Sequence, residues 1–427
     1  MRQTRNPYLP GWEFIPDGEP KQFGDRVYVY GSHDEAEGKQ YCTGDYVCWS
    51  APADDLANWT FEGVTFKKTD DPNYKEEVFL LAPDVICGPD GKYYLYYFTS
   101  KMDKLGVAVC TTPGGHYEYY GDVKFEDGTV LTERAGYGLM FDPGIYSGPE
   151  GNYLYYGFAL QKRKEGFPEV GYKGGYVVQL EDDMLTIRGI PKSTIPGKLY
   201  TEGTGYEGHG FLEASSIRRL NEKFYLIYSS ELGHELCYAV SDDPMGPFSY
   251  KGTIVSNGDV GLNGRDEADA VNYLGNNHGG LVAVDDELYI FYHRHTYGAQ
   301  YSRQGCAEKV VLQKDGTIPQ VEITSSGMST QNSYVHNLQD GAACGFKYLD
   351  FAGDEKTVAV ICRGNFKGQI LVYLEEERRT LVAKIDVAPS ETWTVAEAKL
   401  AETKGVCGLY FVFAGEGACD MDSFRIR

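Results

Sequence analysis

The chain has 427 residues, and its 62 acidic and 40 basic side chains give a formal net charge of −22 at pH 7. That charge argues against a nucleic acid partner, because phosphate binding needs clustered Lys and Arg. No stretch approaches the roughly 20 apolar residues of a membrane helix, so no membrane partner is expected. The 35 tyrosines and 52 glycines are typical of a β-rich protein with many turns.

The N-terminus and the cysteines bear on the cellular location. The segment Met1–Tyr8 has charge but no apolar run behind it, so no secretory signal is expected in this sequence, although a signal removed earlier stays open. Ten cysteines are spread without CxxC pairing, and several lie in apolar segments. They are interpreted as buried thiols rather than as a disulfide framework or a zinc site. Together these features predict a cytoplasmic protein.

One aromatic strand pattern recurs five times, with starts about 65 residues apart, a period typical of a large propeller blade. The repeats are Val27–Ser32, Tyr93–Phe98, Asn152–Gly157, Phe224–Ser229 and Leu288–His293. An acid or a histidine precedes each repeat: Asp17 and Glu19, Asp84, Asp142, Glu213, and His278. Equivalent positions of different blades converge on one central pocket. A ring of carboxylates around one pocket suggests sugar chemistry.

The segments between the repeats complete the blades. Further β segments, such as Tyr46–Pro52 and Cys237–Ser241, follow the first four repeats, and hairpin signals such as Gly148–Gly151 precede them. No sustained 3.6-residue apolar period occurs up to residue 325, so long helices are not expected. The prediction is a five-bladed β-propeller over residues 1–325.

The texture changes from about residue 330. Short apolar or alternating segments, such as Thr357–Cys362 and Gly408–Phe413, are separated by Gly, Asp and charged turns. This pattern predicts a separate jelly-roll-like β-sandwich over residues 330–427. The fold class is therefore all-β, a propeller followed by a sandwich.

Glycosidic bond hydrolysis needs one carboxylic acid to protonate the leaving oxygen and one carboxylate to activate water or attack carbon. Inverting enzymes hold the two roughly 6.5–9.5 Å apart to leave room for the water. The acid must stay protonated near neutral pH, so burial or a neighbouring negative charge must raise its pKa. Acids at the inner ends of blades one, three and four would meet these demands.

Several short motifs, in order and at blade spacing, resemble glycoside hydrolase family 43 over essentially the first 325 residues. They are Asn6–Pro10 with Pro16–Pro20, Ala82–Val85 before Gly91–Tyr97, Phe141–Pro143, Glu213–Ser216, Asn277–Gly280 and Tyr301–Gln304. The resemblance implies an inverting hydrolase that releases terminal α-L-arabinofuranosyl or β-D-xylosyl residues from plant cell-wall oligosaccharides. It also implies that oligosaccharide is the partner.

The resemblance implies roles for the acids. Glu213 is the expected general acid, and Asp142 is expected to tune its pKa. The general base stays open between two residues: Glu19 is followed by Pro, as the family pattern asks, whereas Asp17 keeps the usual ten-residue distance to the aromatic strand. If Glu19 is the base, the hairpin at Gly24–Arg26 must be shorter than in the other blades.

The remaining expectations concern substrate and ion binding. His278 is expected at the pocket floor, where it would contact substrate and bind a structural calcium ion at the propeller centre, although no cofactor is expected to be required. Arg303 and Phe141, which directly precedes Asp142, are expected to contact sugar. Asp84 contacts substrate or holds a blade, with both alternatives open. Apolar platforms for sugar faces are expected from Trp12 and Trp49.

The C-terminal segment resembles a family 6 carbohydrate-binding module through Gly405–Gly415 and Asp422–Ile426. It either binds sugar, with Trp393 as the platform candidate, or packs on the propeller. Two other function classes stay open for the whole chain. One is a non-catalytic carbohydrate-binding propeller, and the other is an inverting glycoside phosphorylase, which needs a basic phosphate cradle.

Overall fold

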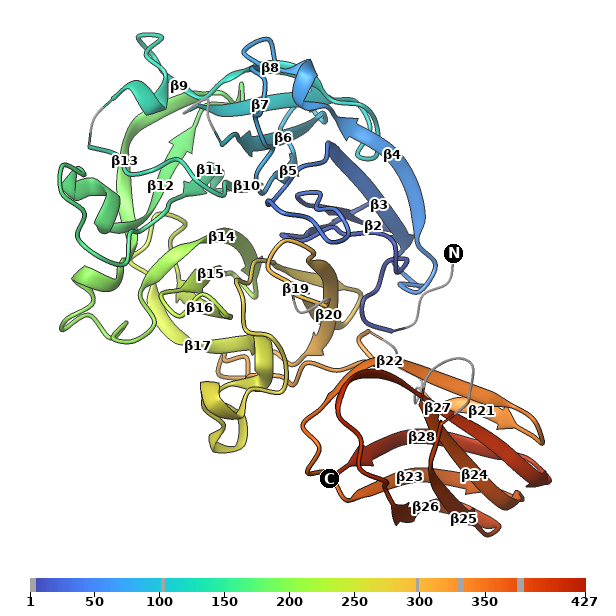
Figure 1. Cartoon of the computed structure of the whole chain (residues 1–427). Coiled ribbons are helices and arrows are strands. Elements are labelled where there is room, and N and C mark those ends of the chain that lie inside the picture. Colours follow the sequence, from blue (N-terminus) through green and yellow to red (C-terminus); the bar gives the residue numbers. More distant parts are fainter. Residues whose placement is uncertain (1–4, 101–103, 135, 297–298, 329–333, 375–379) are drawn as a thin grey trace. The chain divides into compact units, whose positions relative to one another are not determined.

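The computed structural model describes residues 5–100, 104–134, 136–296, 299–328, 334–374 and 380–427. The chain forms two compact units, Met1–Met328 and Ser329–Arg427, both built from β-strands (Figure 1). The described residues contain no α-helix, and their short 3-10 turns are η1 (Lys68–Asp70), η2 (Leu131–Glu133), η3 (Glu169–Tyr172), η4 (Lys198–Tyr200), η5 (Asn257–Asp259), η6 (Leu262–Gly264) and η7 (Glu267–Asp269). None of these short turns could span a membrane.

The first unit is a ring of five antiparallel sheets. Blade one is β1 (Glu19–Phe23), β2 (Arg26–Tyr30), β3 (Tyr46–Pro52) and β4 (Thr60–Phe66), and blade two is β5 (Asp84–Cys87), β6 (Tyr93–Phe98), β7 (Leu105–Cys110) and β8 (Glu118–Asp122). Blade three is β10 (Gly144–Gly148), β11 (Gly151–Tyr156), β12 (Gly174–Leu180), β13 (Thr186–Pro196) and a parallel addition, β9 (Lys124–Phe125). Blade four is β14 (Phe211–Leu220), β15 (Lys223–Ser230), β16 (Glu235–Ser241) and β17 (Ser249–Ser256), and blade five is β18 (Leu281–Val284), β19 (Glu287–Arg294) and β20 (Gln304–Val310).

The first strands of the blades line the axis. Each of β1, β5, β10, β14 and β18 contacts the first strand of the next blade, and β18 contacts β1, so the ring is closed. The N-terminal segment also ties the last blade to the first, because the Tyr8 amide donates to the Gly305 carbonyl at 3.2 Å. Asn6 adds side-chain bonds on both sides of Ala307, accepting from its amide at 2.9 Å and donating to its carbonyl at 3.1 Å.

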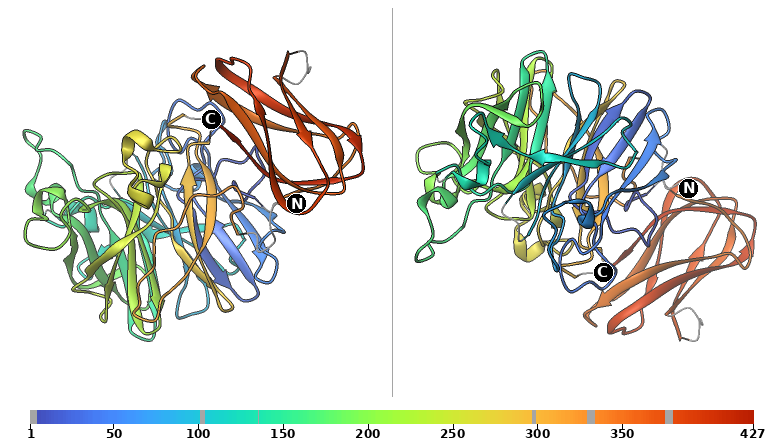
Figure 2. Two further views of the ribbon diagram at one scale, coloured as in Figure 1. Left: turned by 90° about the horizontal axis from the view of Figure 1, so that it is seen from below. Right: turned by 90° about the horizontal axis from the view of Figure 1, so that it is seen from above.

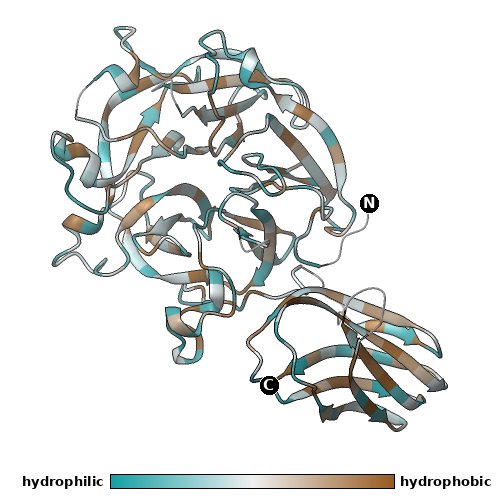
Figure 3. Ribbon diagram, viewed as in Figure 1, coloured by the Kyte–Doolittle hydropathy of each residue, from teal (hydrophilic) through white to brown (hydrophobic). Residues whose placement is uncertain are grey.

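The aromatic repeats form the second strand of each blade, one position further from the axis than the acids. Their tyrosines lie between neighbouring sheets, and Tyr96, Tyr155 and Tyr228 are fully buried. Seen from the side, the strands run between two faces where the connecting loops lie (Figure 2), and the apolar colouring follows the strands more than the loops (Figure 3). Both faces of such a strand pack on a sheet, which explains the continuous apolar runs in the sequence.

The second unit is a β-sandwich of two four-stranded sheets. One sheet has the order β21 (Val335–Leu338), β28 (Cys419–Ile426), β23 (Thr357–Gly364) and β26 (Ser390–Lys399), and the other has β22 (Ala343–Phe351), β27 (Gly405–Glu416), β24 (Lys367–Leu374) and β25 (Thr380–Val387). The core between them is apolar, with Val360, Ile370 and Phe411 fully buried. The predicted fold class, a five-bladed propeller followed by a sandwich, is confirmed.

All ten cysteines are free, and Cys42, Cys48, Cys237, Cys306, Cys362 and Cys419 are buried. This agrees with the interpretation of the cysteines as buried thiols. A reducing compartment suits such unpaired thiols, and the cytoplasmic location stays a prediction.

Candidate active site

Asp17 and Asp142 occupy equivalent places in blades one and three. Each lies two residues before the first ladder pair of its inner strand, which joins Glu19 to Tyr30 in blade one and Gly144 to Tyr155 in blade three. Both have left-handed backbones, with φ of 57° and 47°. Asp tolerates this conformation better than most residues, and such strain clusters at functional sites. The two carboxylates therefore enter the axis from matching turns.

Glu213 reaches the axis through an irregularity in β14. The register of β14 against β15 shifts on both sides of Glu213, and Ala214 has a positive φ of 67°. A bulge of this kind re-aims a side chain. The Ala214 amide donates to Asp142 Oδ2 at 3.1 Å, so the bulge also fixes the carboxylate of the neighbouring blade beside Glu213.

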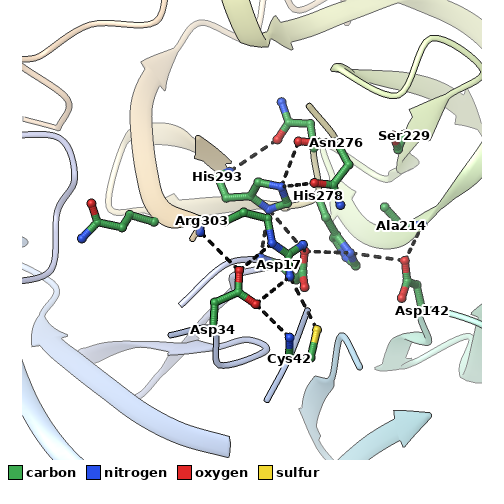
Figure 4. Close-up of polar contacts among 12 residues, drawn as sticks. Asp17, Asp34, Cys42, Asp142, Ala214, Ser229, Asn276, His278, His293 and Arg303 are labelled. Atoms are coloured by element: carbon green, nitrogen blue, oxygen red, sulfur yellow. Dashed lines mark hydrogen bonds and ion pairs between the residues drawn. The ribbon is translucent and has the colours of Figure 1, made fainter. Parts of the chain in front are cut away.

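Asp17 is held as an anion by Arg303 (Figure 4). The guanidinium donates from Nη1 to Asp17 Oδ1 at 3.0 Å and from Nε to Asp34 Oδ2 at 2.8 Å. Burial opposes ionisation, but Arg303, His293 and His278 together outweigh it and hold the pKa of Asp17 well below its usual range. His293 fixes the turn, because it accepts the Asp17 amide proton at Nδ1 (3.1 Å) and lies with Nε2 2.9 Å from the Asn276 carbonyl.

His278 lies between the three axial carboxylates. Its Nδ1 is 3.4 Å from Asp142 Oδ2 and 3.9 Å from Asp17 Oδ1, and its Nε2 is 3.8 Å from Glu19 Oε1. Although burial disfavours the imidazolium, the carboxylates led by Asp142 raise the pKa of His278 well above its usual value. His278 is therefore a buried cation at the centre of the ring.

Glu19 lies in a different environment from Asp17. Its Oε2 accepts from Arg218 Nη2 at 2.7 Å and from Ser216 Oγ at 3.0 Å. Burial opposes its ionisation, but Arg218, His278 and Lys21 together outweigh that effect and lower the pKa of Glu19 to about 2. A Cβ atom at Gly280 would lie 2.7 Å from Glu19 Oε2. This close approach explains why position 280 is a glycine. Glu19 is therefore a fully buried carboxylate whose ion pair with Arg218 has a structural role.

Asp84 is also fully enclosed. Its Oδ2 accepts from Lys21 Nζ at 2.9 Å and from the Ile145 amide at 2.8 Å, so it joins blades one, two and three. Its side chain is not accessible to solvent. Of the two alternatives for Asp84, holding the blades agrees with these contacts, and the expected substrate contact is wrong, because every approach to the carboxylate is occupied by protein.

The carboxyl groups at the axis differ in pKa. Burial and then the negative charge of Asp142 raise the pKa of Glu213 to about 8. Burial likewise raises the pKa of Asp142, against the opposing charge of His278. Glu213 itself is half-buried, and no hydrogen bond or ion pair joins it to another side chain in the part of the chain that the structure describes. One carboxyl is thus kept protonated near neutral pH while Asp17 stays ionised.

The expected aromatic platforms differ from one another. Trp49 lies in β3 and is 3% exposed, and its indole N–H donates to Glu13 Oε2 at 2.8 Å. The platform role of Trp49 is therefore wrong, because β3 is covered on both faces. Trp12 is 65% exposed, with its ring 5.9 Å from that of Trp49, and its role stays a prediction.

Phe141, next to Asp142, is half-buried in a group of three aromatic rings. Its ring centroid lies 5.9 Å from that of Phe98 and 5.2 Å from that of Phe158, both edge to face. This group offers an apolar surface beside the carboxylates, and sugar contact by Phe141 stays a prediction. Sugar contact by Arg303 also stays one, since its described bonds go to Asp17, Asp34 and Cys42.

The calcium ion expected near His278 does not fit the residues around it. Calcium takes 6–8 oxygen ligands. Glu19 Oε1 is the one nearby carboxylate oxygen among the described residues that is buried without a hydrogen-bond partner. The positive charge at the axis is already supplied by His278, Arg218 and Lys21. The expected role of His278 as a calcium ligand is therefore not supported.

Sequence reasoning missed four residues that hold the predicted site. His293, Lys21 and Arg218 contact the predicted acids, and Asp34 pairs with Arg303. Two of them carry a local signal. Lys21 is two residues from Glu19 and so points to the same face of a strand, and His293 ends an aromatic repeat where the other blades have Ser, Gly or Phe. Asp34 carries none, because its partner Arg303 is 269 positions away in the sequence.

A closed propeller with carboxyl groups of opposed acidity at its axis defines a glycoside hydrolase of the five-bladed propeller class. The family model of glycosyl hydrolases family 43 matches residues 4–318, and the chain belongs to that family. The predicted family and enzyme class are confirmed. The model of family 6 carbohydrate-binding modules matches residues 313–427.

Two known proteins resemble the chain along essentially its whole length, and a third resembles about three quarters of it. A xylosidase/arabinosidase of Thermoclostridium stercorarium is 42% identical, covering 100% of this chain and 99% of the relative. A family 43 arabinoxylan arabinofuranohydrolase of Bacillus subtilis, solved with cellotetraose, shares the fold with a TM-score of 0.58 at 21% identity, over 99% of this chain and 97% of that one. An α-L-arabinofuranosidase of Clostridium thermocellum has a TM-score of 0.54 at 26% identity, over 76% and 99%.

Proposed function

We propose that the chain is an inverting glycoside hydrolase that releases terminal α-L-arabinofuranosyl or β-D-xylosyl residues from plant cell-wall oligosaccharides. The observation that carries this proposal is the opposed acidity of two axial carboxyls, with the pKa of Glu213 raised to about 8 and that of Asp17 held well below its usual range. Pairs of carboxyls set apart in this way divide the acid and base roles between them.

In the proposed mechanism, Glu213 donates its proton to the leaving glycosidic oxygen. Asp17 accepts a proton from a water molecule, which attacks the anomeric carbon from the opposite face of the sugar. Arg303 is a positioning residue that keeps Asp17 ionised, and Asp142 keeps Glu213 protonated until the bond breaks. Of the two candidates for the base, Asp17 is favoured, because Glu19 is closed off by Arg218 and Ser216.

The substrate class rests on the family and on the relatives. The relative of Thermoclostridium stercorarium, which covers the whole chain, carries the name xylosidase/arabinosidase. A glycoside phosphorylase would need cations free to hold phosphate. The cations at this site are instead paired with carboxylates, as Arg303 is with Asp34 and Lys21 with Asp84. This pairing favours water as the acceptor.

Substrates that differ in leaving group test the proposal. A leaving group of low pKa needs no proton, whereas a sugar leaving group does. Glu213→Ala should therefore lose at least about 100-fold in kcat on xylobiose or an arabinoxylan oligosaccharide, and far less on a dinitrophenyl glycoside. NMR of the first-formed anomer should show inversion.

Glu202→Gln is the matched control, since Glu202 is an exposed acid of the segment that leads to β14. It should behave as the wild type on both substrates. An equal loss of Glu213→Ala on both leaving groups, or a retained anomer, would contradict the assigned mechanism. Turnover that requires inorganic phosphate would replace hydrolysis by phosphorolysis.

A further inference from the structure

Blade four contains three metal-ligating side chains that the proposed mechanism does not use. His209 precedes β14, and Glu235 and Cys237 are alternate residues of β16, so their side chains share one face. Their ligand atoms all lie within 4.8 Å of one another, the one such group of three or more found among the described residues. The three side chains come from two segments that the blade brings together.

The distances between the ligand atoms are close to those around a tetrahedral metal ion. His209 Nδ1 is 2.7 Å from Glu235 Oε1, Cys237 Sγ is 3.2 Å from the same oxygen, and the sulfur is 3.8 Å from the nitrogen. Zinc bonds of about 2.0–2.3 Å place tetrahedral ligands about 3.3–3.7 Å apart. Shifts of less than about 1 Å would therefore admit an ion at the centre of the three atoms.

Further side chains orient these ligands. Thr253 Oγ1 donates to Glu235 Oε2 at 2.9 Å, and Ser230 Oγ donates to Oε1 at 2.5 Å. The imidazole of His209 stacks on the ring of Tyr250, with centroids 4.9 Å apart and 15° between the planes. Outer groups of this kind fix ligand orientation in metal sites.

Charge and access also suit a divalent cation. The Glu235 carboxylate and a Cys237 thiolate would together neutralise two positive charges, which matters because both are buried. The Cys237 thiol proton would leave for solvent when the metal binds. The side chain of His209 is 33% exposed, which gives an ion a path in and leaves a place for a water ligand.

We propose that His209, Glu235 and Cys237 form a zinc site in blade four, completed by water. The ligand set of one imidazole, one carboxylate and one thiolate suits zinc, whose ligands are nitrogen, oxygen and sulfur. The ion ties β16 to the segment that enters β14, four residues before Glu213. Its role is structural, because it joins two segments of one blade.

Cobalt titration of the full-length chain tests this site after dialysis against a chelator. We expect one equivalent of Co²⁺ to bind with a thiolate-to-cobalt absorption band, and Zn²⁺ to displace it. His209→Ala and Cys237→Ser should each weaken binding at least about 10-fold. Cys237→Ser should remove the absorption band, and His209→Ala should lower its intensity. Zn²⁺ should raise the Tm of the wild type and leave that of His209→Ala unchanged.

Cys419→Ser is the matched control, because Cys419 is a buried free thiol of β28 in the sandwich and lies outside blade four. It should bind cobalt as the wild type does. A wild-type chain without a thiolate band, or a full band in Cys237→Ser, would overturn the proposal and leave a hydrogen-bonded His–Glu pair. His209→Ala keeps the test valid if Cys237→Ser fails to fold, since His209 lies partly at the surface.

Discussion

The propeller buries charged side chains around its axis, whereas the sandwich buries apolar ones almost alone. Asp17, Glu19, Asp84, Asp142 and Arg303 are all at most 5% exposed. Among the described residues of the sandwich, Thr403 is the one buried polar side chain. Burying charges is costly even when they are paired, so stability alone would favour the apolar design. The charged axis is best explained by chemistry at that axis.

The buried carboxylates of the propeller also differ from one another. Glu19 and Asp84 form ion pairs with Arg218 and Lys21, whereas no Lys, Arg or His among the described residues forms an ion pair with Glu213. The ion-paired carboxylates hold blades together, and Glu213 is free to exchange a proton. Variants of each kind should therefore fail in different ways.

The largest expected effect is on turnover. Asp17→Asn removes the group that activates water, so kcat should fall by about 10²–10⁴-fold at every pH. Arg303 would then lack one carboxylate partner but keep Asp34, and circular dichroism and Tm should change little. Asp25→Asn, an exposed position of the first hairpin, is the control. A D17N enzyme with near-normal kcat would return the base role to Glu19.

Glu19→Gln should act on stability before activity. It leaves the guanidinium of Arg218 without its charge partner, and breaking a buried ion pair lowers the free energy of unfolding by about 3–5 kcal/mol. Urea unfolding measures the loss of stability. The pH profile of kcat/KM, recorded at low temperature where the variant is folded, should keep the shape of the wild-type profile. A profile whose acid limb moves would mean that Glu19 takes part in the reaction.

The sandwich should respond to substitution without any effect on chemistry. Phe411→Ala opens a cavity in its apolar core, and losing a buried phenylalanine typically lowers the free energy of unfolding by about 3–5 kcal/mol. Activity on small nitrophenyl glycosides should stay within about twofold, because the catalytic groups belong to the other unit. Calorimetry and kinetics on the same sample would compare the two. A large loss of kcat would contradict the assignment of catalysis to the propeller alone.

The sequence carries the blade pattern because Tyr-rich strands packed between sheets leave a strong local signal. Assigning the base was harder, because it depends on strand register. Glu19 pairs with Tyr30 and so belongs to the strand itself, two residues after the turn that presents Asp17. The sequence left this undecided, since hairpin length and register are properties of the folded sheet.

The wrong prediction for Trp49 and the missed partners of the acids also depend on how the sheets pack in the folded chain. Trp49 was expected at a sugar-binding surface, but a propeller covers both faces of β3 and buries the indole. Its N–H then needs an acceptor, which Glu13 provides. Long-range partners such as Asp34 and Arg303 are joined only by ring closure, so no local pattern could connect them.

The most direct test of the central claim is the pH dependence of kcat/KM for the wild type and Asp142→Asn. With the pKa of Glu213 raised to about 8, wild-type activity should fall as pH rises through that value, because the acid loses its proton. Removing the negative charge of Asp142 lowers the pKa of Glu213, so the alkaline limb should move to lower pH in the variant. An alkaline limb that stays in place, or moves to higher pH, would contradict the account.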